Sequence, residues 1–343
     1  MIANPARGWC MLRDHSSWGN LVEESVCIFC SGGGDLWWEK ADKLPPHERF
    51  RIVRCAECGL AWVSPRPSPE EIGRYYPQTY NWKPEQEGTE SAVHRLERWY
   101  RFHNLRFETR QLMRHTDLAP GDAVLDVGCG SGDRLLVLKQ MGLKPTGIEI
   151  TPAADYARER LGLDVRRGTI EQVRFEPEKF QAVTLYNVIE HVHDPRSVLR
   201  EVRRVLVPGG WLALQYPNVR CLQARLFGKR WAAVDVPRHL YYFSPASIER
   251  LLELERFQEI SVVAKTSFLH PPTAVISIVP WSDPLRFWEA EAGGKRLKGF
   301  VARMVWAGLT LLVSPAVWLE SACGRSAVCT TFARKALNPA KSR

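Results

Sequence analysis

The feature of this 343-residue sequence that most constrains its fold is an apolar run that ends in a glycine-rich loop. Residues 123–127 (AVLDV) have the pattern of a short buried strand, and the loop 128–132 (GCGSG) leads directly into a helical segment at 134–141. Glycines in such a loop let the backbone approach a ligand closely and present amide groups at the helix N-terminus. Glu149 ends the next strand, where a carboxylate can accept both hydroxyls of a ribose. The arrangement predicts a site for a nucleotide-like cofactor.

Two cofactors compete for this loop. A dinucleotide fingerprint requires G-x-G-x-x-G, whereas this loop reads G-x-G-x-G and is followed by Asp133, whose negative charge would face a pyrophosphate. S-adenosylmethionine has no phosphate and carries a sulfonium, an ammonium and a carboxylate. Asp126, near the end of the first strand, can hold the ammonium group directly or through water. The charges therefore favour S-adenosylmethionine.

Strands and helices alternate downstream of residue 120, as is typical of a parallel sheet with helices on both faces. Strands are predicted at 123–127, 145–150, 163–168, 180–186, 211–216, 259–265 and 327–335. Helices are predicted at 91–115, 134–141 and 153–161, and after the capping pairs Asp194-Pro195 and Ser244-Pro245, with Pro208-Gly209-Gly210 as the stop before residue 211. The pattern predicts an α/β, Rossmann-like fold.

Four segments of the sequence resemble the successive motifs of class I S-adenosylmethionine-dependent methyltransferases: VLDVGCGSG (124–132), GIEI (147–150), YNVIEHVHDP (186–195) and VPGGWLALQYPN (207–218). The bacterial group related to ubiquinone-biosynthesis O-methyltransferases is the most similar. The resemblance covers residues 95–265 and resumes at 327–335. It extends to the CxxC…RCxxCGL pattern and SPRPSPEEIGRYY (64–76) near the N-terminus. It implies the seven-stranded class I sheet, preceded by a small zinc ribbon. The predicted function is methyl transfer to a small-molecule, glycan or lipid-linked acceptor; oxygen is favoured, but nitrogen and carbon acceptors share this cofactor machinery and stay open.

Carried over residue by residue, the resemblance implies a cofactor site on the glycine loop and on the ends of the neighbouring strands. Asp126, Gly128, Gly130 and Gly132 would line the methionine and ribose, Glu149 would bind the ribose, Thr169 and Ile170 would clamp the adenine, and Asn187 would lie beneath the cofactor. Many relatives have an acidic residue near position 169, so this departure leaves the contact with the adenine amino group open. The alternative is a non-catalytic scaffold with a degenerate cofactor site.

Glu190 and His191 follow the fourth predicted strand, at the mouth of the crevice where the cofactor would bind. If the acceptor is a hydroxyl, a histidine is the natural general base near neutral pH. In the alternative interpretation His191 only packs beneath the cofactor and Glu190 fixes a loop. Quinone O-methyltransferases that use a metal at this loop carry a further carboxylate where this chain has Asn187, so no catalytic divalent metal is expected.

Residues 231–243 (WAAVDVPRHLYYF) combine aromatic, acidic and basic side chains in a loop, where substrate recognition usually resides. His239 is a further catalytic candidate. The residues expected to contact the acceptor are Trp231, Asp235, Arg238 and Tyr241. A packed loop with a capping role is the alternative.

Two CxxC pairs, formed by Cys27, Cys30, Cys55 and Cys58, match the ligand pattern of a closed tetrahedral zinc site. Redox disulfides are the alternative, but neither pair lies at a thioredoxin-like strand–helix junction. A zinc ribbon is also compatible with an alternative function, that of an RNA-binding methyltransferase. Because residues 21–66 are nearly charge-balanced, they offer little attraction for phosphates, and a nucleic-acid partner is not expected.

Composition and charge indicate the class of protein, and the sequence pattern predicts its divisions. The 45% hydrophobic and 25% charged residues exclude a wholly disordered, collagen-like or polytopic membrane protein, and the first twenty residues lack the apolar run of a signal peptide, so a cytoplasmic protein is expected. The predicted divisions are a leader (1–20), a zinc-ribbon-like module (21–66), a linker (67–90), a methyltransferase domain (91–265 with 326–336), a helical insertion (266–325) and a tail (337–343). The sequence leaves the oligomeric state open.

The insertion contains sixteen consecutive uncharged residues, 304–319, interrupted by Pro315 and preceded by basic residues. The run is too short to span a bilayer readily. The chain from residue 293 onward carries nine basic residues and one acid, Glu320, which suits an anionic membrane surface at the inner face of the membrane. A buried helical pair or a dimer contact is the alternative.

Overall fold

The computed structural model describes residues 22–76, 92–264, 270–279 and 296–337. Its largest sheet has seven strands in the order β12-β13-β10-β9-β6-β7-β8. The strands β10, β9, β6, β7 and β8 are parallel to their neighbours, whereas β13 is antiparallel to both β10 and β12. Their bounds are β6 (Ala123–Val127), β7 (Lys144–Glu149), β8 (Val165–Arg167), β9 (Phe180–Tyr186), β10 (Leu206–Pro217), β12 (Phe257–Val263) and β13 (Val328–Lys335). The predicted fold class is confirmed.

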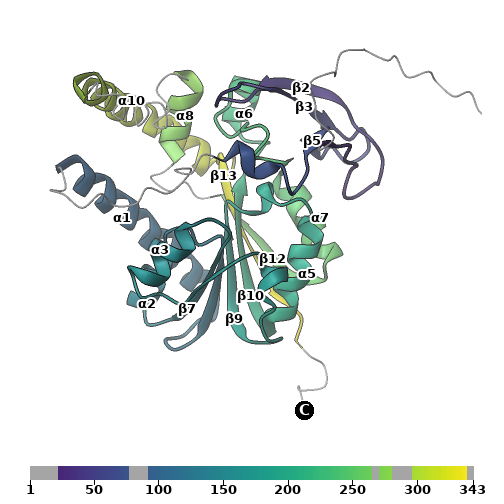
Figure 1. Ribbon diagram of the computed structural model, residues 1–343, viewed down its shortest axis with the longest axis vertical. Coiled ribbons are helices and arrows are strands. Elements are labelled where there is room, and N and C mark those ends of the chain that lie inside the picture. The colour runs from purple at the N-terminus through teal and green to yellow at the C-terminus, as the bar shows by residue number, and fades with distance from the viewer. Residues whose placement is uncertain (1–21, 77–91, 265–269, 280–295, 338–343) are drawn as a thin grey trace, which may run out of the picture.

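Helices cover both faces of this sheet (Figure 1). One face carries α1 (Ala92–His115), α2 (Asp133–Gln140) and α3 (Ala153–Glu159); the other carries α5 (Pro195–Val205) and α7 (Pro245–Leu254). The capping pairs act as predicted: Asp194 accepts the N–H of Ser197 at 3.0 Å, and Ser244 accepts that of Ser247 at 3.2 Å. The described residues also form short helices and 3₁₀ turns. The short helices are α4 (Ile170–Val173) and α6 (Leu222–Phe227), and the 3₁₀ turns are η1 (Ile72–Tyr75), η2 (Ile189–His191) and η3 (Gly228–Arg230).

The start of β10 differs from the prediction. Pro208-Gly209-Gly210 lies within the strand, because α5 already ends at Val205 and the strand begins at Leu206. The register against β9 shifts between Leu206 and Trp211, which marks an irregular entry into the strand. A Cβ on Gly210 would lie 2.9 Å from the carbonyl oxygen of Val207, so the irregularity depends on close backbone approach.

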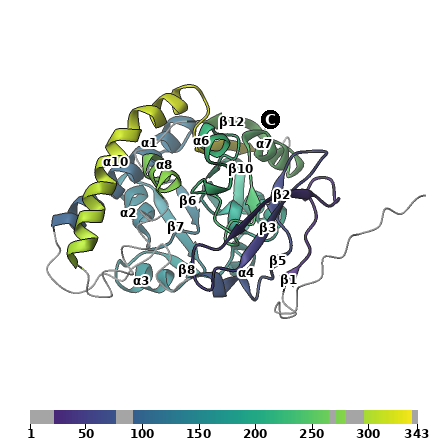
Figure 2. The ribbon, with the colours of Figure 1, turned by 90° about the horizontal axis from the view of Figure 1, so that it is seen from above.

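A second sheet, of four strands in the order β11-β4-β3-β2, combines two segments that lie far apart in the sequence. The strands β2 (Asp35–Ala41), β3 (Arg49–Arg54) and β4 (Ala61–Val63) come from the N-terminal module, whereas β11 (Tyr241–Tyr242) comes from the loop 231–243. Tyr241 pairs with Trp62. A two-stranded ribbon of β1 (Val22–Glu23) and β5 (Arg66–Pro67) adjoins this sheet. The N-terminal module is therefore joined to the methyltransferase-like part by backbone hydrogen bonds (Figures 1 and 2).

The insertion contributes α8 (His270–Ile278) and α10 (Arg296–Ala322), which pack against each other at the periphery (Figure 2). The prediction that Pro315 interrupts the apolar run is wrong, because α10 continues through this residue. Proline removes one helical hydrogen bond, and the carbonyl it leaves, that of Leu311, belongs to a residue that is 75% exposed and open to water. Among the described residues one stretch, Met304–Ala322, is long and apolar enough to cross a membrane, with a mean hydropathy of 1.3.

Several predicted segments lie outside the described residues. These are the leader, residues 77–90 of the linker, part of the insertion and most of the tail. The domain boundaries therefore stay predictions.

Candidate active site and cysteine cluster

The glycine loop connects β6 to α2 in a backbone conformation that residues other than glycine rarely adopt. Gly128, Gly130 and Gly132 all have positive φ. A Cβ on Gly128 would lie 2.5 Å from Cγ2 of Val188, so this glycine permits the loop after β9 to pack against the glycine loop. A Cβ on Gly130, by contrast, would meet no protein atom within 4 Å. The surface of the loop at Gly130 is thus open for a ligand.

Glu149, at the end of β7, forms a hydrogen bond with the backbone of this loop. Its Oε2 accepts the N–H of Gly130 at 3.0 Å, and its Oε1 accepts the N–H of Thr151 at 2.8 Å. Each carboxylate oxygen can accept more than one hydrogen bond. Glu149 therefore retains the capacity to accept ribose hydroxyls while it holds the loop, and its contact with the ribose stays a prediction.

Asp126 lies beneath the loop, almost fully buried, and accepts the hydroxyl of Thr184 at 2.5 Å. Burial raises the pKa of Asp126 to about 6. Arg134 of α2 lies 3.9 Å from its carboxylate and forms a 2.8 Å ion pair with Glu108 of α1. No sequence motif marks Arg134 or Glu108, because only the packing of α1 against α2 brings them together.

The charges around the loop favour a cationic ligand. Three buried carboxylates, of Glu108, Asp126 and Glu149, are accompanied by the partly buried guanidinium of Arg134. Arg134 also stacks on the ring of Tyr186, with its guanidinium carbon 3.7 Å from the ring centroid. The excess negative charge suits a sulfonium and an ammonium and opposes a pyrophosphate.

The remaining predicted cofactor residues have protein partners of their own. Thr169 caps α4 and exchanges hydrogen bonds with Gln172. The side chain of Ile170 is 1% exposed and belongs to the core. Asn187 adopts the left-handed conformation (φ 55°), and its side-chain amide donates to Gln215 at 3.2 Å. A strained residue directly after a central strand is typical of functional sites.

His191 and His239 come together although they lie 48 positions apart in the sequence. Their rings meet edge to face with centroids 4.6 Å apart. The Nδ1 atom of His191 lies 2.9 Å from the carbonyl oxygen of Arg238, and that of His239 lies 2.8 Å from the carbonyl oxygen of Ala233. Because a carbonyl oxygen only accepts, these contacts place the proton on Nδ1 and leave Nε2 of both rings as a lone-pair acceptor. Burial lowers the pKa of His191 to about 3 and that of His239 to about 4, so both rings are neutral at pH 7.

Glu190 lies beside this histidine pair and is 1% exposed. Neither of its carboxylate oxygens has a hydrogen-bond partner among the described residues. Burial raises the pKa of Glu190 to about 8, so the carboxyl group is mainly protonated at neutral pH. A protonated Glu190 can donate a hydrogen bond, which an ionised one cannot.

The four predicted acceptor contacts are buried, with Trp231 1%, Asp235 5%, Arg238 0% and Tyr241 2% exposed. Asp235 and Arg238 form an ion pair of 2.7 Å, and Arg238 also pairs with Asp42 of the N-terminal module at 2.6 Å. Tyr241 accepts a hydrogen bond from Arg66 at 3.0 Å. These side chains therefore hold the loop in place, and within it the partly exposed His239 is the predicted residue open to an acceptor.

Tyr76 is a neighbour of His191 that the sequence analysis placed in the linker. Its hydroxyl lies 2.9 Å from Nδ1 of His191. Asp42 and Tyr76 precede their partners by 196 and 115 positions, and no sequence motif connects them.

The four cysteines of the CxxC pairs form one cluster, with their sulfur atoms all within 4.8 Å of one another. Sγ of Cys27 and Sγ of Cys58 are 3.4 Å apart. Zn–S bonds of about 2.3 Å in a tetrahedron require sulfur atoms about 3.8 Å apart, so the cluster is of the size that a zinc ion needs. Each pair lies on a tight turn in which Ser31 or Gly59 has positive φ directly after the second cysteine.

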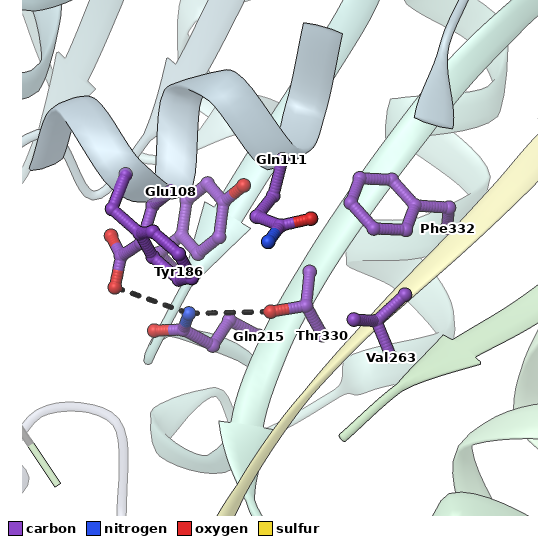
Figure 3. Close-up of a pocket in the computed structure, with 8 residues that line it drawn as sticks. Glu108, Gln111, Tyr186, Gln215, Val263, Thr330 and Phe332 are labelled. Carbon is purple, nitrogen blue, oxygen red and sulfur yellow. Dashed lines mark hydrogen bonds between the residues drawn. The ribbon is translucent and has the colours of Figure 1, made fainter. Parts of the chain in front are cut away.

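A small polar cavity lies between α1 and the sheet (Figure 3). Its volume is about 20 Å³, and its lining includes Glu108, Gln111, Gln215 and Thr330. Gln215 donates to Glu108 and to Thr330, as the dashed lines show. Because a cavity of this size holds about one water molecule, it is too small for an acceptor.

Comparisons with known proteins agree with the geometry of the cofactor side. A family model described as a methyltransferase domain matches residues 96–260. The ubiquinone biosynthesis O-methyltransferase of Pseudomonas paraeruginosa is 39% identical over 133 residues, which are 36% of this chain and 57% of the relative. That of Chromobacterium violaceum is 30% identical over 151 residues, 40% of this chain and 65% of the relative.

The chain thus spans 57% of the length of the first of these relatives. Among solved structures, a Thermotoga maritima SAM-dependent methyltransferase is 21% identical, with a TM-score of 0.44 over 71% of this chain and 96% of that one.

Proposed function

Because residues 96–260 form a class I S-adenosylmethionine-dependent methyltransferase domain, we propose that the whole protein transfers a methyl group to an oxygen of a small-molecule, glycan or lipid-linked acceptor. The observation that carries the proposal is the pair of neutral imidazoles formed by His191, in the loop after β9, and His239, in the loop 231–243. Val188 contacts Gly128 of the glycine loop, and His191 follows three residues later. The proposed proton acceptors therefore lie beside the proposed donor site.

When bound, S-adenosylmethionine supplies a methyl group on a sulfonium, which is a good leaving group. The residues of this chain then have two tasks. Asp126, Glu149 and the glycine loop bind the cofactor, and the loops after β9 and β10 exclude water and orient the acceptor. The lone pair on Nε2 of His191 would accept the proton of an acceptor hydroxyl held beside the methyl group that the cofactor supplies. Nε2 of His239 can accept a hydrogen bond from the same hydroxyl or from a second one.

Mass spectrometry of reaction products, with small phenols, glycan extracts and lipid extracts as acceptors, tests the proposal. We expect a mass gain of one methyl group that depends on S-adenosylmethionine. His191→Gln should lower kcat about 100-fold with little effect on cofactor binding. His103→Gln is the control, since His103 is an exposed residue of α1. Absence of calorimetric S-adenosylmethionine binding to the folded, zinc-loaded protein would refute the proposal.

We also propose a structural zinc ion on Cys27, Cys30, Cys55 and Cys58. The sulfur separations support a closed four-ligand site, and such sites contribute directly to folding. Metal analysis of protein purified without chelator should find about one equivalent of zinc per chain. A Cys55→Ser variant that keeps its full metal content would contradict the proposal.

A lipid-linked acceptor and peripheral association with an anionic membrane surface are part of the same proposal. Side chains of α10 support them: Leu311 and Leu312 are each 75% exposed and Leu319 is 65% exposed. On the neighbouring α6, Leu226 is 72% exposed, next to the exposed Arg225. A monomeric protein rarely exposes so many apolar side chains together.

Sedimentation with phosphatidylglycerol vesicles at low salt tests the membrane association. We expect the full chain to sediment with these vesicles and much less with phosphatidylcholine vesicles. Replacing Leu311 and Leu312 together by serine should reduce binding, whereas replacing the exposed Leu254 of α7 by serine should not. Protein that stays in the supernatant as a dimer would identify α10 as a contact between copies.

A further inference from the structure

We propose that Tyr76 and Asp42, two residues of the N-terminal part of the chain, are positioning residues for the histidine pair. This inference rests on the proposed function, since it assigns to His191 and His239 the role of proton acceptors. It gives the N-terminal module a part in the acceptor site in addition to its metal cluster.

Tyr76 touches the imidazole of His191 directly. Its hydroxyl lies 2.9 Å from Nδ1 of His191 and 3.5 Å from the carbonyl oxygen of Arg238, which is the acceptor of the same Nδ1. The ring nitrogen, the hydroxyl and the carbonyl thus form a triangle. Burial raises the pKa of Tyr76 far above neutrality, so its hydroxyl keeps its proton for the Arg238 carbonyl. This triangle fixes the orientation of His191 and favours the Nδ1–H tautomer, which leaves Nε2 as the acceptor.

Asp42 acts on the histidine pair indirectly, through Arg238. Its carboxylate binds the guanidinium of Arg238 with two hydrogen bonds, of 2.6 Å and 3.1 Å, and both side chains are buried. Asp235 binds the same guanidinium at 2.7 Å and 3.1 Å. The backbone of Arg238 carries the carbonyl that holds His191, and His239 is the next residue. Fixing this one guanidinium therefore places both histidines.

The backbone connects the same two regions. Tyr241 and Tyr242, directly beyond His239 and Leu240, pair with Trp62 and Ala61 of β4. The N–H of Leu240 donates to the carbonyl of Glu190 at 2.8 Å, and the N–H of Val63 donates to the carbonyl of Leu240 at 2.9 Å. The chain around Leu240 thus bridges the N-terminal module and the loop after β9, which carries His191. A shift of the module would be transmitted to both histidines.

The test uses the full, zinc-loaded chain labelled with ¹⁵N-histidine, and NMR reports the tautomer of each imidazole without any methyl acceptor. Tyr76→Phe removes one hydroxyl, and Asp42→Asn keeps an oxygen acceptor while Asp235 still balances the charge of Arg238. Each variant should lower the fraction of the Nδ1–H tautomer of His191. Tyr75→Phe is the matched control, because the hydroxyl of Tyr75 binds Glu48 and is not part of the triangle. If the tautomer of His191 is unchanged in both test variants, the proposal is wrong.

Kinetics provides a second measurement once an acceptor is known. Tyr76→Phe should lower kcat about tenfold and leave the KM for S-adenosylmethionine within twofold. In a His191→Gln background Tyr76→Phe should have no further effect, because it acts through that imidazole. An equal loss in both backgrounds would overturn the positioning role. Failure of the proposed methyl transfer would leave the NMR result intact, so the two failures are distinguishable.

Discussion

The cofactor half of the molecule, which comprises β6, β7 and the glycine loop between them, is assembled from neighbours in sequence. Gly130 donates to Glu149, only 19 residues further along the chain. The proposed acceptor half comprises the loops 187–193 and 231–243 with the N-terminal module, and there Asp42 binds Arg238 across 196 residues. The cofactor half is held by contacts within a local motif, whereas the other half depends on contacts between segments that are far apart in the sequence. Damage to the second should therefore spare the first.

Loss of the proposed zinc site is the strongest way to separate the two halves. We expect Cys55→Ser to abolish zinc binding and lower methyl transfer more than 100-fold, because β2, β3 and β4 lose the site that anchors them. Affinity for S-adenosylmethionine, measured by calorimetry, should change less than threefold. Cys323→Ser is the control, since Cys323 is exposed and lies outside the cluster. An equal loss of cofactor binding would show that the halves are not separable.

Gly130→Ala tests the cofactor half in isolation. Gly121→Ala is its matched control: both glycines have positive φ, and a Cβ on either would meet no protein atom within 4 Å. Both substitutions should cost about 1 kcal/mol of unfolding free energy through backbone strain. Gly130→Ala alone should weaken S-adenosylmethionine binding, by about tenfold or more, because its methyl group enters the ligand space. Equal affinities in the two variants would remove the glycine loop from the cofactor site.

Glu190→Gln tests how the acceptor half responds to pH. The pKa of Glu190, about 8 in the folded protein, lies above its ordinary value of 4.5. A raised folded pKa stabilises the protein fully below the unfolded pKa, and this contribution is lost as the pH rises toward 8. The unsubstituted protein should therefore lose stability relative to Glu190→Gln between pH 5 and 8, by at most about 1.4 kcal/mol per pH unit. Denaturant titrations at several pH values measure the difference, and parallel curves would contradict it.

Thr184→Val is expected to have the smallest effect and to act only on the cofactor half. The hydroxyl of Thr184 donates to Asp126, so its loss should raise the pKa of that carboxyl further above 6. Protonated Asp126 cannot attract an ammonium group. Affinity for S-adenosylmethionine should then fall two- to threefold at pH 6.5 and return to the unsubstituted value at pH 8.5. A loss that does not vary with pH would exclude this cause.

The same contrast explains what the sequence could reveal. The strand pattern, the helix caps and the glycine loop depend on contacts over a few tens of residues, and the structure confirms the seven-stranded fold that they predicted. Arg134, Glu108, Tyr76 and Asp42 carry no motif, because their partners are set by tertiary packing. Arg238 shows the limit most clearly. A charged residue in a loop suggests a ligand contact, but here two carboxylates, one of them 196 residues away, neutralise it inside the protein.

The pairing of β11 with β4 has a consequence for how the protein is made. During synthesis the cysteine-bearing turns leave the ribosome early, yet the edge of their sheet is completed only when Tyr241 and Tyr242 have emerged. Until then β4 exposes unpaired backbone groups, a state that invites association with other chains. A contact over so long a stretch of chain also forms slowly, since the ends of a large loop must meet. Chains truncated before residue 241 should therefore aggregate, although they contain every cysteine of the cluster and the whole glycine loop.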